Sequence, residues 1–232
     1  MNARKHWKGF SFLAAAAVAA MLLVGAVVTI AQGPPAGGPP PGFAPPPPPK
    51  AGPVTLDVQD GSSASYRVTE QLAGVNFPND AIGTTPAVTG AIAINADGTI
   101  NSSASKLTID LRPLKSDQEM RDGYLQKRTL ETDKFPDAVF VPKTLTGIPS
   151  PFPNNGQAGF QLSGDLTIHG TTAPVTWQGI ATFNKDGASG RASTKFAFST
   201  FGLTKPAIAR LLSVDDNINL EVVFKFKTTR GN

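Results

Sequence analysis

The chain has 232 residues, of which 40% are hydrophobic, enough for one well-filled domain. It contains no Cys, which excludes disulfides, thiolate metal sites and cysteine nucleophiles. One of its two His lies near the N-terminus, which excludes a site of several histidines in the folded part. Setting aside Arg4, Lys5 and Lys8 leaves 18 of the 21 Lys and Arg against 17 Asp and Glu, a net charge of +1. This nearly neutral body has no basic run, which argues against a nucleic-acid partner.

Residues 1–33 have the pattern of a signal peptide or an N-terminal membrane anchor. Basic residues precede an apolar run from Gly9 to Ala31 that only Ser11 and Thr29 interrupt. The small residues Thr29 and Ala31 are typical of a cleaved signal, whereas a run of about 20 residues also suits a membrane span, and both interpretations remain open. In either case the domain that follows is expected outside the cytoplasm, periplasmic, secreted or at the cell surface, and membrane-anchored if the segment stays uncleaved.

Residues 34–53 are rich in Pro, Gly and Ala and include five consecutive prolines, Pro45–Pro49. Such a segment cannot build a core and favours extended polyproline II. We interpret it as a semi-rigid spacer; the alternative is a ligand for a proline-binding module.

Residues 54–232 show the alternation of β-strands. Apolar side chains take every second position in three long runs, 160–168, 175–183 and 218–226, and in shorter runs at 66–68, 88–94, 107–111 and 196–198. Turn residues such as Asn95–Gly98, His169–Gly170 and Asn184–Gly187 separate the runs. About eight closely spaced strands with one apolar set of faces predict an antiparallel barrel or sandwich.

Two segments favour helix instead. Ser116 and Glu119 have the spacing of a capping box, which predicts a helix running towards Thr129. A shorter helical turn is expected over Pro206–Leu212, with Pro near its start. Both are interpreted as connections that cover the ends of the sheet.

Three stretches of this sequence resemble landmarks of the YceI-like family, over roughly Ser62–Lys227. The most specific is Gly164–Val175 (GDLTIHGTTAPV). The others are Arg121–Leu125 (RDGYL) with Asp133–Pro136 (DKFP) and Val139–Phe140 (VF), and Phe198–Leu203 (FSTFGL). The resemblance implies a mainly β, extended antiparallel, lipocalin-like barrel of about eight strands with one or two short helices. Its interior tunnel would hold an isoprenoid-type lipid chain.

Strand phase and the resemblance together suggest which side chains line that tunnel. They are Phe135, Phe140, Phe160, Leu162, Leu166, Ile168, Trp177, Phe183, Phe196, Phe198, Leu220 and Phe224. Arg121 and Tyr124 are candidates for the tunnel mouth, although Arg121 and Asp122 could instead serve to fasten the helix to the barrel. The family usually has His where this chain has Tyr124, so the sequence departs from the family pattern at this position.

Asp165, Thr167 and His169 share the polar face of one strand without forming a recognisable catalytic group. Successive residues on one face lie about 6 to 7 Å apart, too far for Asp165 to orient His169. We expect His169 to hydrogen-bond backbone beside its glycine turn, and we expect neither catalytic residues nor a cofactor or metal. The sequence thus predicts a lipid-binding protein for carriage, storage or sequestration. The alternatives are a structural or stress-adapter domain with a filled core, or an envelope enzyme; the oligomeric state stays open.

Overall fold

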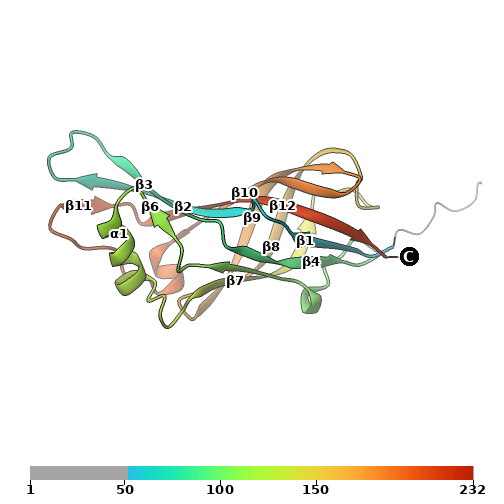
Figure 1. The fold of residues 1–232 in the computed structure, drawn as a ribbon, viewed down its shortest axis with the longest axis horizontal. Helices are drawn as coiled ribbons and strands as arrows, with labels where there is room; N and C mark the ends of the chain where they lie inside the picture. Colours follow the sequence, from blue (N-terminus) through green and yellow to red (C-terminus); the bar gives the residue numbers. More distant parts are fainter. Residues whose placement is uncertain (1–51, 232) are drawn as a thin grey trace, which may run out of the picture. The chain divides into compact units, whose positions relative to one another are not determined.

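Eight antiparallel strands close into a barrel in residues 52–231, the part of the chain that the structure, a computed structural model, describes (Figure 1). Each strand is hydrogen-bonded to the next around the wall, and the last returns to the first. In wall order the strands are β1 (Val54–Val58), β4 (Val88–Ile94), β5 (Lys106–Asp110), β7 (Asp137–Thr146), β8 (Gly156–Ile168), β9 (Thr171–Asn184), β10 (Gly187–Ala197) and β12 (Asn217–Arg230). The predicted lipocalin-like barrel of about eight strands is confirmed.

Four further strands lengthen the wall of this domain at one end. They are β2 (Ser63–Leu72), β3 (Asn79–Thr85), β6 (Lys115–Ser116) and β11 (Leu211–Val214). The long β12 carries both parts of the wall, because β1 pairs with its residues 226–230 and β2 with its residues 219–223. Between β1 and β2 the chain turns at Gly61, whose φ of 86° is accessible mainly to glycine. The barrel is therefore extended beyond its closed ring, as Figure 1 shows at the end marked by β11 and α1.

The predicted helix after Ser116 is present but starts later than its capping pattern suggests. α1 (Glu119–Tyr124) continues into a π-helical turn, η2 (Leu125–Thr129). Ser116 itself lies in β6, and its hydroxyl donates a 2.7 Å hydrogen bond to Asp122 instead of capping the helix. The pairing of β6 with β3 takes priority over the local capping signal.

The predicted helical turn over Pro206–Leu212 is wrong. Residues 203–208 form no regular element, and Leu211–Val214 is strand β11, paired with β2. The part of β2 that extends past β12 offers unpaired backbone groups, and β11 satisfies them. Two short 3-10 turns, η1 (Ser102–Ala104) and η3 (Phe198–Phe201), complete the elements of the described residues.

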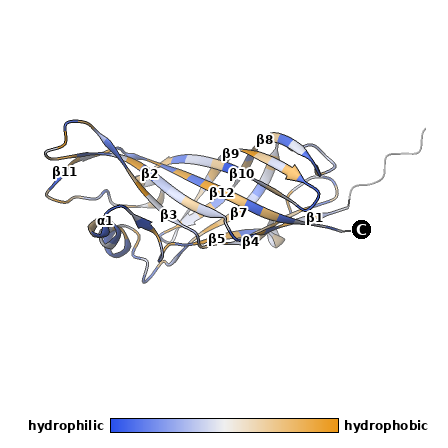
Figure 2. Cartoon of the chain, turned by 45° about the horizontal axis from the view of Figure 1, so that its top comes forward, coloured by the Kyte–Doolittle hydropathy of each residue, from blue (hydrophilic) through white to orange (hydrophobic). Residues whose placement is uncertain are grey.

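The alternating pattern places its apolar phase inside the barrel, as predicted. Figure 2 shows apolar and polar residues following one another along the strands. Leu166, Phe140 and Trp177 are only 1%, 3% and 5% exposed, and they belong to one continuous core cluster. Because successive side chains of a strand point to opposite faces, one apolar residue in two suffices to fill the interior.

Candidate ligand-binding cavity

An apolar cavity of about 850 Å³ lies at the lengthened end of the barrel, next to α1. Its volume is within the range of about 300 to 1,000 Å³ that is usual for small-molecule sites. β2, β10, β12 and η3 form its wall, and α1, η2 and the segment before β11 surround its opening. The wall includes Val68, Leu111, Phe196, Phe198, Ile218 and Leu220.

A smaller cavity of about 90 Å³ continues deeper into the barrel. Ile109, Trp177 and Val222 line both cavities and so form the boundary between them. Aromatic rings fill most of this deeper half: Phe140 meets Trp177 edge to face with ring centroids 6.1 Å apart, and Phe160 meets Phe224 at 5.9 Å. One half of the interior is thus open and the other is packed.

The candidate lining residues divide between the two cavities. Ile168, Trp177, Phe196, Phe198 and Leu220 line the large cavity, and Phe140, Phe160, Leu162, Phe183 and Phe224 line the small one, together with Trp177. Leu166 and Phe135 line neither of them. Leu166 is packed into the core, and the Phe135 ring lies edge to face on the His169 ring at 4.6 Å.

Both candidate mouth residues line the large cavity, and Arg121 also fastens the helix to the barrel. Its guanidinium donates to Glu70 on β2 at 2.6 Å and also pairs with Asp117. Tyr124 accepts a 3.4 Å hydrogen bond from the backbone N–H of Ala207, which links α1 to the segment before β11. Arg121 therefore lies on the cavity lining and also holds α1 against the barrel wall.

The ion pair of Glu70 and Arg121 is nearly buried. Their side chains are 10% and 15% exposed. Burial by itself would lower the pKa of Arg121, but its hydrogen bonds with Asp117 and Glu70 outweigh burial and raise the pKa. The guanidinium is therefore firmly charged, and its charge is already matched by two carboxylates.

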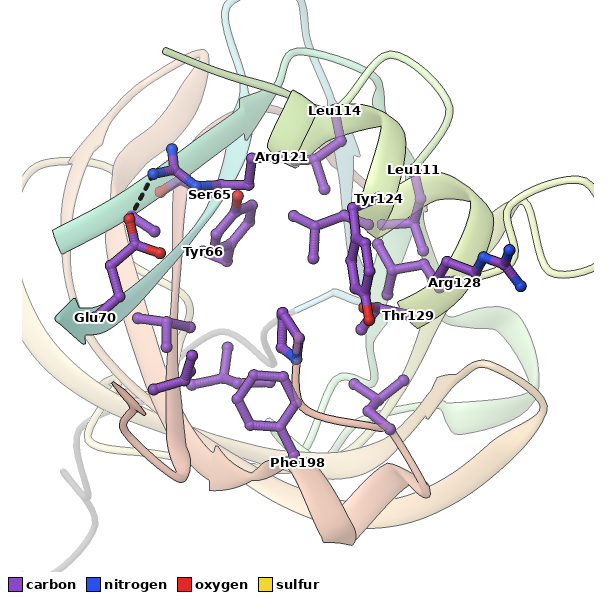
Figure 3. Close-up of a pocket in the computed structure, with 18 of the residues that line it drawn as sticks. Ser65, Tyr66, Glu70, Leu111, Leu114, Arg121, Tyr124, Arg128, Thr129 and Phe198 are labelled. Atoms are coloured by element: carbon purple, nitrogen blue, oxygen red, sulfur yellow. Dashed lines mark hydrogen bonds and ion pairs between the residues drawn. The ribbon is translucent and has the colours of Figure 1, made fainter. Parts of the chain in front are cut away.

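Three buried polar atoms of this interior have no hydrogen-bond partner among the described residues. They are the hydroxyls of Tyr66 and Thr129 and the indole Nε1 of Trp177, and all three residues line the large cavity. Ser116 lies near Tyr66, but its hydroxyl is donated to Asp122 and already accepts from Arg121 and from the backbone N–H of Gln118. Burial raises the pKa of Tyr66 to about 12, so its phenol stays protonated and able to donate. In Figure 3, Tyr66, Arg121 and Glu70 lie on one side of the opening and Tyr124 and Thr129 on the other.

Glu70, Tyr66 and Thr129 are not among the residues singled out from the sequence. A signal for Glu70 exists, since Tyr66, Val68, Glu70 and Leu72 occupy the same phase of β2 and all four line the cavity. A carboxylate on an apolar strand face is costly unless it is paired, and here its partner comes from 51 residues further along the chain. Thr129 has no comparable signal, because η2 was expected only as a cover.

His169 pairs with a side chain and not with backbone, contrary to the expectation. Its Nε2 lies 2.8 Å from a carboxylate oxygen of Glu131, and its φ is 50°. Asp165 pairs instead with Lys143 at 2.6 Å. Within residues 52–231 no three His, Asp or Glu side chains are grouped so as to hold a metal ion.

The closed antiparallel barrel with an apolar cavity at one end defines a lipocalin-like barrel. The YceI-like domain matches residues 55–226, and a UPF0312 protein of Pseudomonas fluorescens is 34% identical over 143 residues, 55% of this chain and 69% of the relative. The chain belongs to the YceI-like family. The match to a UPF0312 protein of Pseudomonas putida, 32% identical over 127 residues, spans 50% of this chain and 62% of that relative.

Two solved structures share the fold at low sequence identity. A polyisoprenoid-binding domain from Saccharophagus degradans, implicated in plant cell wall breakdown, has a TM-score of 0.57 at 13% identity over 76% of this chain and 98% of its own. Burkholderia cenocepacia BcnA has a TM-score of 0.54 at 17% identity over 73% and 99%.

Proposed function

We propose that this protein binds an isoprenoid-type lipid chain in its barrel and carries, stores or sequesters it outside the cytoplasm, without catalysing a reaction. The observation that carries the proposal is the cavity of about 850 Å³ with its apolar wall, which a fully packed barrel would not contain. Family membership and the fold shared with a polyisoprenoid-binding domain support the choice of ligand class.

Exposed apolar side chains beside the opening support carriage. Met120 on α1 and Ile208 both line the cavity, yet they are 78% and 43% exposed. Both side chains thus place apolar surface in contact with water at the cavity, which favours transfer of an apolar chain from a membrane or another carrier.

Placement outside the cytoplasm rests on the sequence of residues 1–33, which lie outside the described residues. Within residues 52–231 no helix is long and apolar enough to cross a membrane. An uncleaved apolar run from Gly9 to Ala31 would tether the barrel, and a cleaved one would release it.

Native mass spectrometry of the full-length protein purified from its own membranes, followed by lipid extraction, tests the proposal. We expect a co-purifying isoprenoid-type lipid. Adding a soluble polyprenyl analogue to the lipid-free protein at a hundredfold excess over its Kd should stabilise the fold by about 2.7 kcal/mol and raise Tm by roughly 5 to 10 °C.

A pair of variants separates binding in the cavity from binding elsewhere. Ala81 is 5% exposed and lines the cavity, whereas Ile180 is 51% exposed on the wall. Ala81→Phe should cost about 1 to 3 kcal/mol of stability and abolish the ligand-induced shift, and Ile180→Phe should leave the shift unchanged. If no lipid is extracted and no analogue raises Tm, the domain is a structural barrel without a ligand.

A further inference from the structure

We infer that the cavity selects a lipid chain that ends in an uncharged, oxygen-bearing head group, a hydroxyl or a carbonyl, and not in a phosphate. The inference rests on the proposed function and adds the chemistry of the head group. It comes from the polar atoms of the large cavity, which fall into two sets with opposite properties.

The first set consists of neutral groups without partners. The Thr129 hydroxyl is buried in a residue only 4% exposed, and the Tyr66 hydroxyl is likewise enclosed. A buried polar group left without a hydrogen bond costs about 1 to 3 kcal/mol, and such groups in native proteins usually have a ligand or water as partner. A ligand oxygen beside Tyr66 would accept the hydrogen bond that no described residue accepts.

The second set consists of charged groups that are already satisfied. Arg121 is paired with Glu70 and Asp117, so its single positive charge is already offset by two carboxylates and offers little net attraction to a phosphate. The Glu70 carboxylate also lines the cavity and would repel a second anion. Taking an anion out of water without a free cation to receive it is strongly unfavourable.

Three further cations, Lys127, Arg128 and Arg210, line the opening but are exposed to solvent. Ion pairs at exposed positions are worth at most about 1 kcal/mol and are screened at physiological ionic strength. They do not offset the loss of hydration that an anion undergoes on moving inward. The buried subsite next to Tyr66 is therefore suited to a neutral head group.

Three probes of equal chain length test this inference on the full-length protein: a polyprenol, its monophosphate and the polyprenyl hydrocarbon with the same double bonds and no head group. Titration at physiological salt, followed through Trp177 fluorescence in a Trp7→Phe background, gives the three affinities. We expect the alcohol to bind about three- to tenfold more tightly than the hydrocarbon, the value of one additional hydrogen bond, and more tightly than the phosphate.

Tyr66→Phe keeps the ring and removes the hydroxyl. It should bring the alcohol down to the affinity of the hydrocarbon, while the affinity for the hydrocarbon itself stays the same. Glu70→Gln removes one of the two negative charges that offset Arg121. It should therefore reduce the difference in affinity between the alcohol and the monophosphate.

The outcomes distinguish this inference from the proposed function. A phosphate that binds wild type more tightly than the alcohol overturns the inference alone, and so does an alcohol preference that survives in Tyr66→Phe. Failure of all three probes to bind overturns the proposed function as well.

Discussion

The ring of Tyr66 lies across Gly83, its direct partner on the neighbouring strand. The two residues are paired in the β2–β3 ladder, and a Cβ atom on Gly83 would stand 2.3 Å from Tyr66 Cε1. Phe160 with Gly179 and Phe224 with Gly190 repeat the arrangement on the barrel wall. In each pair the missing side chain lets an aromatic ring lie against the sheet, so glycines on the inner face help to shape the interior.

Gly83→Ala should displace the Tyr66 ring. The three atoms nearest to such a Cβ all belong to the Tyr66 side chain, so the ring must move while the backbone can stay. We expect a modest loss of stability, about 1 to 2 kcal/mol, and weaker binding of a polyprenol. Thermal unfolding and probe titration measure the two effects.

Gly159→Ala on β8 is the matched control, because its would-be Cβ meets only the backbone oxygen of Gly179, at 3.9 Å, and the residue lines neither cavity. It should stabilise the strand by roughly 0.5 to 1 kcal/mol and leave binding intact. Equal stability and equal polyprenol binding of the two variants would contradict the contact between the Tyr66 ring and Gly83.

The raised pKa of Tyr66 makes stability depend on alkaline pH. Burial holds the phenol protonated in the folded state up to about pH 12, whereas in the unfolded chain it ionises near 10. Between these values the unfolded state binds fewer protons, so stability falls as pH rises and the contribution is fully present below 10. Urea unfolding from pH 9 to 12 should therefore show a steeper loss for wild type than for Tyr66→Phe; parallel curves would contradict the buried phenol.

Side chains of β8 and β9 that point into the barrel should tolerate a charge far less well than those that point outward. Leu166 is 1% exposed, whereas Thr176 is exposed and shares a 2.8 Å hydrogen bond with Ser163. Leu166→Asp should cost several kcal/mol because its carboxylate would be buried without a partner, and Thr176→Asp about 1 kcal/mol or less. Similar unfolding midpoints for the two variants would show that the strand phase is wrong.

The exposed position of Met120 on the cavity lining predicts an effect on the rate of ligand transfer. Met120→Gln should slow the transfer of a polyprenyl probe from phospholipid vesicles several-fold, because the side chain contacts water beside the opening. Ile180→Gln, an equally polar change at an exposed position on the wall, should leave the transfer rate unaltered. Equal transfer rates for the two variants would show that the lipid does not enter past Met120.

The N-terminal segment gives a prediction that depends on the sequence alone. If the run from Gly9 to Ala31 is uncleaved, the full-length protein should stay in the membrane fraction after a high-salt wash. N-terminal sequencing that finds a start near Gln32 would establish cleavage instead.

The sequence by itself determined the strands and their inner face; the alternation fitted a barrel or a sandwich, and the resemblance to the YceI-like family favoured the barrel. Alternation in runs such as 160–168 and 218–226 follows from the two-residue period of a strand, which is a local property of the backbone. It therefore identified Trp177, Phe196 and Leu220 as interior residues, and these line the large cavity. The same local rules failed at Pro206–Leu212, where an unpaired edge of β2 imposed a strand on a segment that favours a helical turn.

Only the tertiary structure decided which part of the interior is open and what its polar groups contact. Periodicity is the same in a filled and in a hollow barrel, and the difference arises where β12 passes from β1 to β2 and the wall lengthens past the aromatic cluster. Glu70 pairs with Arg121, which lies 51 residues further along the chain, and the Tyr66 hydroxyl is buried without a hydrogen-bond partner among the described residues. Both features depend on contacts between distant parts of the chain. Such contacts are set by how the strands close on one another, which no local pattern in the chain encodes.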